Sequence, residues 1–268
     1  MTRVIAAVDN SLAARPVLAT AQSLAELLGS TVDPVHVRTN GTRVASNETA
    51  AAGLELRVLT GPTVARLREV ADAGDVAAVV VGACGTPASP RPVGSTAFEL
   101  IESLDKPVVV VPPDVARAGE LRRVIVPLEG TLSTSLAPRR LIEIACDADL
   151  DVVVLHVHDE ASLPAFTDQP QHETNAWAEE FLARYVPGQF GDVRLEVRVG
   201  RRNEEVLCAA EELDADLIAL GWSQDLAPGR GPVVRAVLER GHIPVMLVPV
   251  YLAATASSGL ERSSSWTR

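Results

Sequence analysis

An internal repeat constrains this chain more than any other feature of its sequence. The segment from Arg3 to Asp9 (RVIAAVD) returns 120 positions later as Arg123 to Glu129 (RVIVPLE). The segment from Pro34 to Val37 (PVHV) returns at the same spacing as Val154 to Val157 (VLHV). A self-similarity of this length predicts two copies of one fold in tandem.

Within each copy, short β-branched runs alternate with alanine- and leucine-rich stretches of helical periodicity, such as 17–28, 63–73 and 204–213. This alternation predicts an α/β fold, a doubly wound parallel sheet of five strands per copy, with ligands bound at the carboxyl ends of the strands. The expected domains are residues 1–115 and 121–251, joined by a linker over 113–120. A serine-rich tail over 252–268 is expected to be disordered.

Three prolines limit where elements form. Asp33 and Pro34 fall within the second expected strand, and a proline cannot donate to a strand ladder, so that strand is expected to be short or distorted. Pro16 and Pro138 lie near the starts of two expected helices. Proline is tolerated only in the first turn, so those helices should begin no earlier than about Ala13 and Leu136.

Composition excludes several classes of function. The formal net charge is -11 and aromatic residues make up 3% of the chain, so neither nucleic-acid binding nor attraction to an anionic membrane is expected. The three cysteines are far apart, which predicts a reducing compartment without disulfides. Neither a membrane span nor a signal peptide is recognisable, so a cytoplasmic location is expected.

The stretch from Val79 to Thr96 is typical of a phosphate-binding loop. An apolar run leads into a glycine-punctuated loop that ends on Gly94-Ser95-Thr96, directly before a helix-like segment over 97–104. Glycines let the backbone approach a ligand closely, and the first amides of a helix attract an anion. The alternative is that Ser95 or Thr96 is an ordinary N-cap for that helix.

These motifs, in this order, resemble the universal stress protein family. The resemblance rests on Val8-Asp9-Asn10-Ser11, Val35-His36-Val37, Gly82-x-x-Gly85, Gly94-Ser95-Thr96 and the closing strand Val108 to Val111. It covers nearly the whole chain, twice, as in the two-domain members of that family. It implies an adenine nucleotide alpha hydrolase-like fold with pseudo-two-fold pairing of the copies. That pairing would join the strands at 108–111 and 245–248 within one chain, with a homodimer as a further possibility.

The resemblance also implies ATP, with or without Mg²⁺, in the first copy. It assigns Asp9 to the ribose and phosphates, where its carboxylate would orient a ribose hydroxyl or hold Mg²⁺, with capping of the next helix as the competing interpretation. Val37 would contact adenine through its backbone. Arg91 is either a phosphate ligand or an exposed solubilising side chain. The full set of expected nucleotide-binding residues is Asp9, Val37, Gly82, Ala83, Gly85, Arg91, Gly94, Ser95 and Thr96.

Both loops depart from the family pattern Gly-x2-Gly-x9-Gly-Ser/Thr. In the first copy the second spacer, 86–93, is one residue short. In the second copy Gln224 stands in place of Gly85, Pro232 in place of Ser95, and Asp225 adds a negative charge. The second copy is therefore expected to have lost tight ATP binding and to serve as a structural or regulatory partner. Its remaining Gly229, Arg230 and Gly231 favour the opposite interpretation.

No catalytic or metal-binding set is recognisable in the sequence. His36 and His156 recur with the repeat, which favours a role in the fold. The His and acidic residues at 158–160 and 172–173 match no metal motif, and the aromatic face of residues 177–185 is expected to dock on the sheet. The hypothesis is a nucleotide-dependent stress-response regulator with an unknown protein partner and at most weak ATP hydrolysis. Its alternatives are a protein-interaction module without nucleotide and a slow adenine-nucleotide hydrolase.

Overall fold

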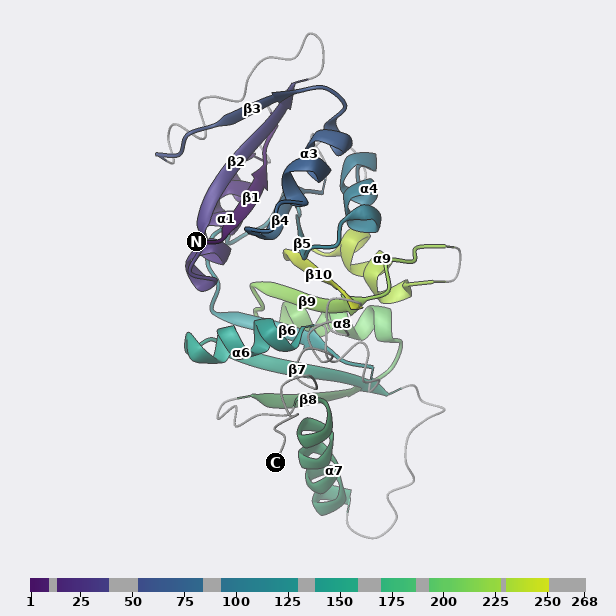
Figure 1. The fold of residues 1–268 in the computed structure, drawn as a ribbon. Helices are drawn as coiled ribbons and strands as arrows, with labels where there is room; N and C mark the ends of the chain where they lie inside the picture. Colours follow the sequence, from purple (N-terminus) through teal and green to yellow (C-terminus); the bar gives the residue numbers. More distant parts are fainter. Residues whose placement is uncertain are drawn as a thin grey trace, which may run out of the picture.

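A computed structural model of the chain describes residues 1–9, 14–38, 53–83, 93–129, 138–158, 170–186, 193–227 and 230–250 (Figure 1). The expected tail lies outside these ranges. The first half contains β1 (Arg3–Ala7), α1 (Ala14–Leu27), β2 (Thr31–Arg38), β3 (Arg57–Thr60), α3 (Thr63–Ala71), β4 (Val76–Gly82), α4 (Ser95–Ser103) and β5 (Val108–Val111). The second half contains β6 (Arg123–Pro127), α6 (Arg139–Asp147), β7 (Asp151–His158), α7 (Pro170–Tyr185), β8 (Arg194–Val199), α8 (Arg202–Glu212), β9 (Leu217–Trp222), α9 (Pro232–Arg240) and β10 (Val245–Pro249).

All ten strands form one sheet in the order β3-β2-β1-β4-β5-β10-β9-β6-β7-β8. The strands within each half are parallel, and the two halves meet where β5 pairs antiparallel with β10, with Val110 opposite Val245 and Val108 opposite Leu247. The order of the second half is the reverse of the first, so the halves are related by a pseudo-two-fold axis. The predicted five-stranded doubly wound copies and the pairing of their last strands are confirmed.

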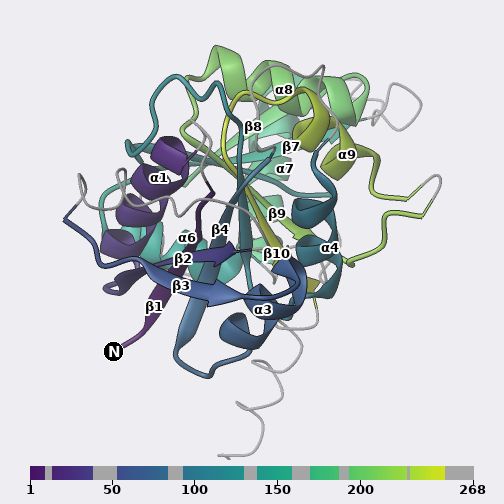
Figure 2. The same cartoon turned by 90° about the horizontal axis from the view of Figure 1, so that it is seen from above.

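Helices cover both faces of this sheet, so the molecule has two apolar cores. Side chains alternate along each strand, and Ile5 therefore packs into one core while Val4 and Ala6 pack into the other. One core lies under α3, α4, α8 and α9, and the other under α1, α6 and the end of α7 (Figure 2). Both cores contain residues of β5 and β10, which makes the junction between the halves part of the buried interior.

The expectation for β2 was wrong, because this strand is eight residues long and keeps an unbroken register with β1. Backbone groups of the odd-numbered residues face β1, as the bond from the Val8 amide to the Val35 carbonyl shows (3.0 Å). The nitrogen of Pro34 therefore faces the other side. On that side β3 begins only opposite Val35, where it pairs with Arg57. Pro34 interrupts no ladder bond, which explains why the strand tolerates it.

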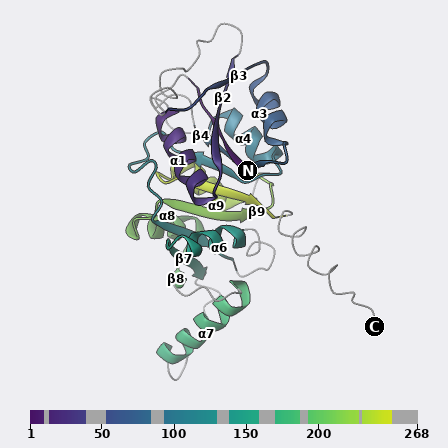
Figure 3. The ribbon, with the colours of Figure 1, turned by 60° about the vertical axis from the view of Figure 1, so that its left-hand side comes forward.

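The helix starts agree with the limits that the prolines set. Helix α1 begins at Ala14, which leaves Pro16 in its first turn, and α6 begins at Arg139, directly after Pro138. The aromatic face of α7 docks as predicted. Phe181 is buried, with its ring 4.7 Å from that of His156 on β7, while the body of α7 extends beyond the sheet (Figure 3).

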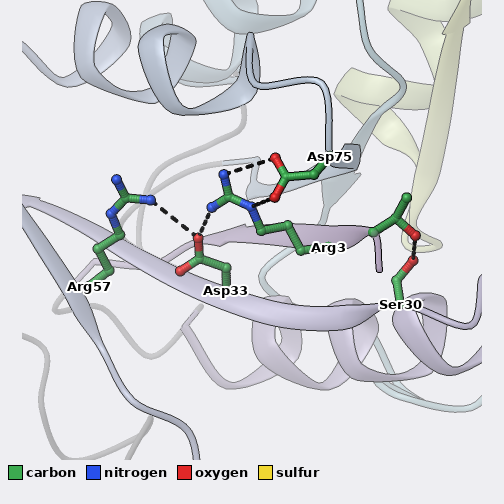
Figure 4. A network of polar contacts seen from close by, with 6 residues as sticks. Arg3, Ser30, Asp33, Arg57 and Asp75 are labelled. Atoms are coloured by element: carbon green, nitrogen blue, oxygen red, sulfur yellow. Dashed lines mark hydrogen bonds and ion pairs between the residues drawn. The ribbon is translucent and has the colours of Figure 1, made fainter.

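Ion pairs fasten the amino ends of the strands in the first half (Figure 4). The guanidinium of Arg3 on β1 contacts Asp33 on β2 and binds both oxygens of Asp75, which precedes β4, at 2.9 and 3.2 Å. Arg57 on β3 lies 3.5 Å from the same Asp33 carboxylate. The hydrogen bonds from Arg3 hold the pKa of Asp75 below its ordinary value. This charge cluster lies at the opposite edge of the sheet from the carboxyl ends.

The expected linker, 113–120, lies against both halves. Asp114 contacts the His242 ring at 2.8 Å, Arg117 contacts Asp214 at 3.1 Å, and the Ser23 hydroxyl on α1 donates to the Gly119 carbonyl. Among the described residues, no helix combines the length and the apolar composition needed to cross a membrane.

Candidate functional site

The strand order creates one topological switch point in each half. In the first half the chain runs outward from β1 to β3 and then restarts on the other side of β1 at β4, so the crevice lies between β1 and β4. The equivalent crevice in the second half lies between β6 and β9. Parallel α/β sheets bind ligands in this crevice, beyond the carboxyl ends of the strands.

The expected binding residues that the structure describes come from this edge of the first half. Asp9 follows β1 and is exposed, Val37 lies near the end of β2, and Gly82 is the last residue of β4. Ala83 is buried, and its carbonyl accepts a hydrogen bond from the Gly94 amide at 2.7 Å. The end of β4 and the start of α4 are thus fastened together. Gly85 and Arg91 lie outside the described residues.

The residue at the start of α4 supplies no side-chain cap. Gly94 occupies the N-cap position with extended dihedral angles (φ −62°, ψ 149°) and, as a glycine, has no side chain that could bond to the first turn. Ser95 and Thr96 are the first two helical residues, so the alternative that either of them is the N-cap is wrong. Because the amides of a first turn have no partner within the helix, this turn can donate hydrogen bonds to an anion.

The two repeated histidines fix the backbone beside each crevice. The Nδ1–H of His36 donates to the Val8 carbonyl at 2.9 Å, and that of His156 donates to the Leu128 carbonyl at 2.8 Å. Each bond ties the second strand of its half to the residue that precedes Asp9 or Glu129. Burial, more than the nearby charges of His158 and Arg202, lowers the pKa of His156. The predicted role of these histidines in the fold matches this geometry.

The second half contains a pocket of about 210 Å³ at its own crevice. Its inner wall consists of buried apolar side chains, and its outer wall carries charges of both signs. The inner wall is formed by Leu128, Leu155, Val157, Val206, Leu220, Trp222 and Val234. The outer wall includes Glu129, Arg202, Ser223, Asp225 and Arg230. Sequence reasoning found the degraded loop here but not the pocket.

Pro127 explains why the pairing of β6 with β9 ends beside this pocket. Their pairing is limited to Val124 with Leu217 and Ile125 with Ile218. The next backbone group of β6 that faces β9 belongs to Pro127, which has no N–H to donate. Ala7 stands at the same position in the first half and pairs with Val81 on β4. Pro127 was therefore the sequence signal that could have predicted the opening.

Gln224 has a role that its position in the loop did not suggest. Its side-chain amide donates to the carbonyls of Leu104, at 2.8 Å, and Ile101, at 3.4 Å, at the carboxyl end of α4 in the other half. Its backbone is left-handed (φ 56°). The residues around it, Trp222, Ser223 and Asp225, line the pocket. Gln224 thus holds the carboxyl end of α4 by hydrogen bonds. The expected phosphate-binding turn lies at the amino end of the same helix.

Metal-binding side chains do not gather among the described residues, where no group of three His, Cys, Asp or Glu residues could hold an ion.

Comparison with known proteins relates the second half of the chain to a known family and the whole fold to solved structures. Residues 120–249 match the model of the Universal stress protein family. A universal stress protein from Archaeoglobus fulgidus superposes with a TM-score of 0.65 at 16% identity, covering 92% of this chain and 96% of its own. A putative universal stress protein from Pseudomonas aeruginosa UCBPP-PA14 gives 0.64 at 13% identity, covering 96% and 98%.

A functionally unknown protein from Pseudomonas aeruginosa PAO1 gives a TM-score of 0.62 at 13% identity and covers 97% of this chain and 98% of its own. No curated protein matches the chain. The three solved structures share the two-half fold over nearly their whole length. The second half of the chain, residues 120–249, therefore matches the universal stress protein family, and the first half repeats the same five-stranded fold.

Proposed function

We propose that this universal stress protein binds ATP in its first half and acts as a nucleotide-dependent regulator. ATP would lie in the crevice between β1 and β4, with its adenine beside Val37 and its phosphates at the first turn of α4. Asp9 would meet the ribose or the Mg²⁺ that accompanies the phosphates. A protein partner would then read the nucleotide-bound surface, which requires different affinities of that partner for the two states.

The observation that carries this proposal is the start of α4. Gly94 leaves the helix without a side-chain cap, so the amides that follow it, together with the Ser95 hydroxyl, fit the oxygens of a phosphate. The bond between Gly94 and Ala83 keeps this turn at the end of β4, beside the crevice. ATP would supply the ribose and phosphate oxygens that these donors meet. We assign no proton transfer to any of these residues, consistent with binding rather than efficient catalysis.

The second half provides a natural test of the phosphate contact. There Pro232 occupies the first helical position, where proline is compatible with a helix but supplies neither an amide donor nor a hydroxyl. Ser95→Pro would introduce the same chemistry into the first half without breaking α4. We expect it to weaken ATP binding about 10- to 100-fold, since hydrogen bonds to charged groups contribute about 1.5–3 kcal/mol each. Calorimetric titration of nucleotide-free protein with ATP measures this loss.

Two matched variants control the experiment. Ser95→Ala removes only the hydroxyl and should cause a smaller loss, while Pro232→Ser alters the second half and should leave the first-half affinity unchanged. Circular dichroism checks that each variant keeps its helices. Absence of adenine nucleotide from the denatured purified protein, together with no binding at millimolar ATP, would refute the proposal and favour a nucleotide-free interaction module. Rapid ATP turnover that is lost on changing Asp9 would favour the hydrolase instead.

A further inference from the structure

The pocket of the second half is more than a degraded copy of the first site. Its opening has a cause in this sequence, because Pro127 ends the pairing of β6 with β9 where Ala7 continues it in the first half. Leu155 and Trp222 on its inner wall are 1% and 4% exposed. The core of the second half therefore surrounds the inner part of the pocket.

The size and the walls of the pocket limit what it admits. Its volume of about 210 Å³ is below the range of about 300–1,000 Å³ that is usual for sites of drug-sized ligands, so a molecule of one or two rings fits better than a nucleoside triphosphate. The inner wall is apolar, and the Trp222 side chain provides an aromatic surface for a flat ring. An uncharged ring compound suits these walls.

The charges around the pocket do not favour a phosphate. Glu129 and Asp225 balance Arg202 and Arg230 on the outer wall, and the Arg230 guanidinium already lies 3.7 Å from the Asp225 carboxylate. Helix α9 begins with Pro232, so its first position has no amide to donate. The oxygens of the Glu129 carboxylate accept hydrogen bonds, which favours a ligand with an N–H or O–H donor.

We infer that the pocket between β6 and β9 is a second ligand site, for a small uncharged ring compound that carries an N–H or O–H donor and no phosphate. This site is independent of ATP binding in the first half. A ligand of this kind explains why the second-half loop lacks the expected phosphate-binding residues while the pocket beside it has an apolar inner wall.

A fluorinated indole provides a direct test, because indole has two fused rings, one N–H donor and no charge. We expect 5-fluoroindole to bind the full-length protein saturably, with a dissociation constant below about 1 mM, as followed by ¹⁹F NMR. Val157→Trp should fill the pocket and abolish this binding. Val37→Trp, the equivalent change in the first half, should leave it intact. Glu129→Ala, at an exposed side chain, should weaken it several-fold without affecting folding.

Competition separates this inference from the proposed function. ATP at millimolar concentration should not displace 5-fluoroindole, and Ser95→Pro should leave 5-fluoroindole binding unchanged even if it abolishes ATP binding. The inference is overturned by the absence of saturable binding to the wild-type protein, by an equal loss in Val37→Trp and Val157→Trp, or by one-for-one displacement by ATP. If Val157→Trp does not fold, an unchanged affinity in Glu129→Ala overturns the assigned donor contact, while the ATP competition still tests the site.

Discussion

At the residue scale, Gln224 connects the two halves. A non-glycine residue with φ near +56° pays a conformational cost of about 1 kcal/mol, and here its side chain caps the last carbonyls of α4. The capped Leu104 and the capping Gln224 belong to different halves, 120 positions apart. The side chain that replaced a loop glycine thus contributes to docking of the halves.

Substitutions of Gln224 should distinguish the stability that its hydrogen bonds contribute from the cost of its left-handed backbone. We expect Gln224→Ala to lower the free energy of unfolding by about 1 kcal/mol, because it removes the bonds to α4 and keeps the left-handed backbone. Gln224→Gly should be nearly neutral, since it also relieves the strain. Urea denaturation of both variants measures the difference. As a control, Asp149→Gly, at another residue with a left-handed backbone, should stabilise the protein by about 0.5–1 kcal/mol. Equal losses of stability in Gln224→Ala and Gln224→Gly would contradict this explanation.

The contrast between His36 and Gln224 shows what sequence can predict about single residues. His36 and His156 recur with the repeat, and a role in the fold follows from that recurrence. Gln224 does not recur, because Gly85 stands at its position in the first copy. Its partner carbonyls lie on a helix of the other half, so only the three-dimensional arrangement reveals its bonds. The same limit applies to Ser95 and Gly94, where sequence proposed a phosphate site but could not decide which residue caps α4.

At the scale of elements, β2 shows that the direction of a backbone group decides whether a proline is tolerated. The sequence predicted that Pro34 lies in a strand. It could not show that the neighbouring strand β3 begins opposite Val35, one position beyond the proline. Pro127 has the opposite effect in β6, because its nitrogen faces the strand that should pair with it. The same residue type is therefore neutral in one half and opens a crevice in the other.

A pair of adjacent substitutions in β2 tests this explanation. Pro34→Ala should change the free energy of unfolding by less than about 1 kcal/mol, because no ladder bond depends on that nitrogen. Val35→Pro should destabilise by about 3 kcal/mol or more, because the Val35 backbone faces β1 and its side chain is buried. Thermal unfolding followed by circular dichroism compares the two. A large loss from Pro34→Ala would show that the nitrogen direction does not explain the tolerance.

The docking of α7 on β7 should depend on pH. Burial lowers the pKa of His156, so the folded state favours the neutral imidazole and the unfolded state, with a pKa near 6.5, binds protons more readily. The stability that His156 contributes is therefore present above about pH 6.5 and is lost as the pH falls below it. We expect the melting temperature to fall less between pH 7.5 and 5.5 in His156→Gln than in the wild-type protein. Parallel pH profiles for the two proteins would exclude this contribution.

At the scale of the whole molecule, the alternation of strands and helices in each repeat predicted the strand count and the doubly wound topology, and the family resemblance predicted the pairing of β5 with β10. These follow from periodicity and from the need to cover two apolar edge strands. The pocket between β6 and β9 did not follow, because its size depends on how two strands diverge and on residues from five elements. Sequence therefore predicted the fold well and the second-half site only as a degraded loop.

Residues 1–115 alone should self-associate. Without β10, the edge of β5 presents the backbone groups of Val108 and Val110, which face β10 in the intact chain. We expect this fragment to form dimers or larger species in sedimentation velocity. Val110→Pro removes one of those edge donors and should shift the fragment towards monomer. A folded fragment that is monomeric without this change would show that β5 needs no partner strand.

The β5–β10 junction also has a consequence in time. About 130 residues separate Val111 from Val245, and synthesis at about 5–20 residues per second makes β5 on the order of ten seconds before β10. During that interval the nascent first half has a finished sheet with an uncovered apolar edge. That edge stays uncovered until β10 is made, so the order of translation sets when this protein is most exposed to misassembly.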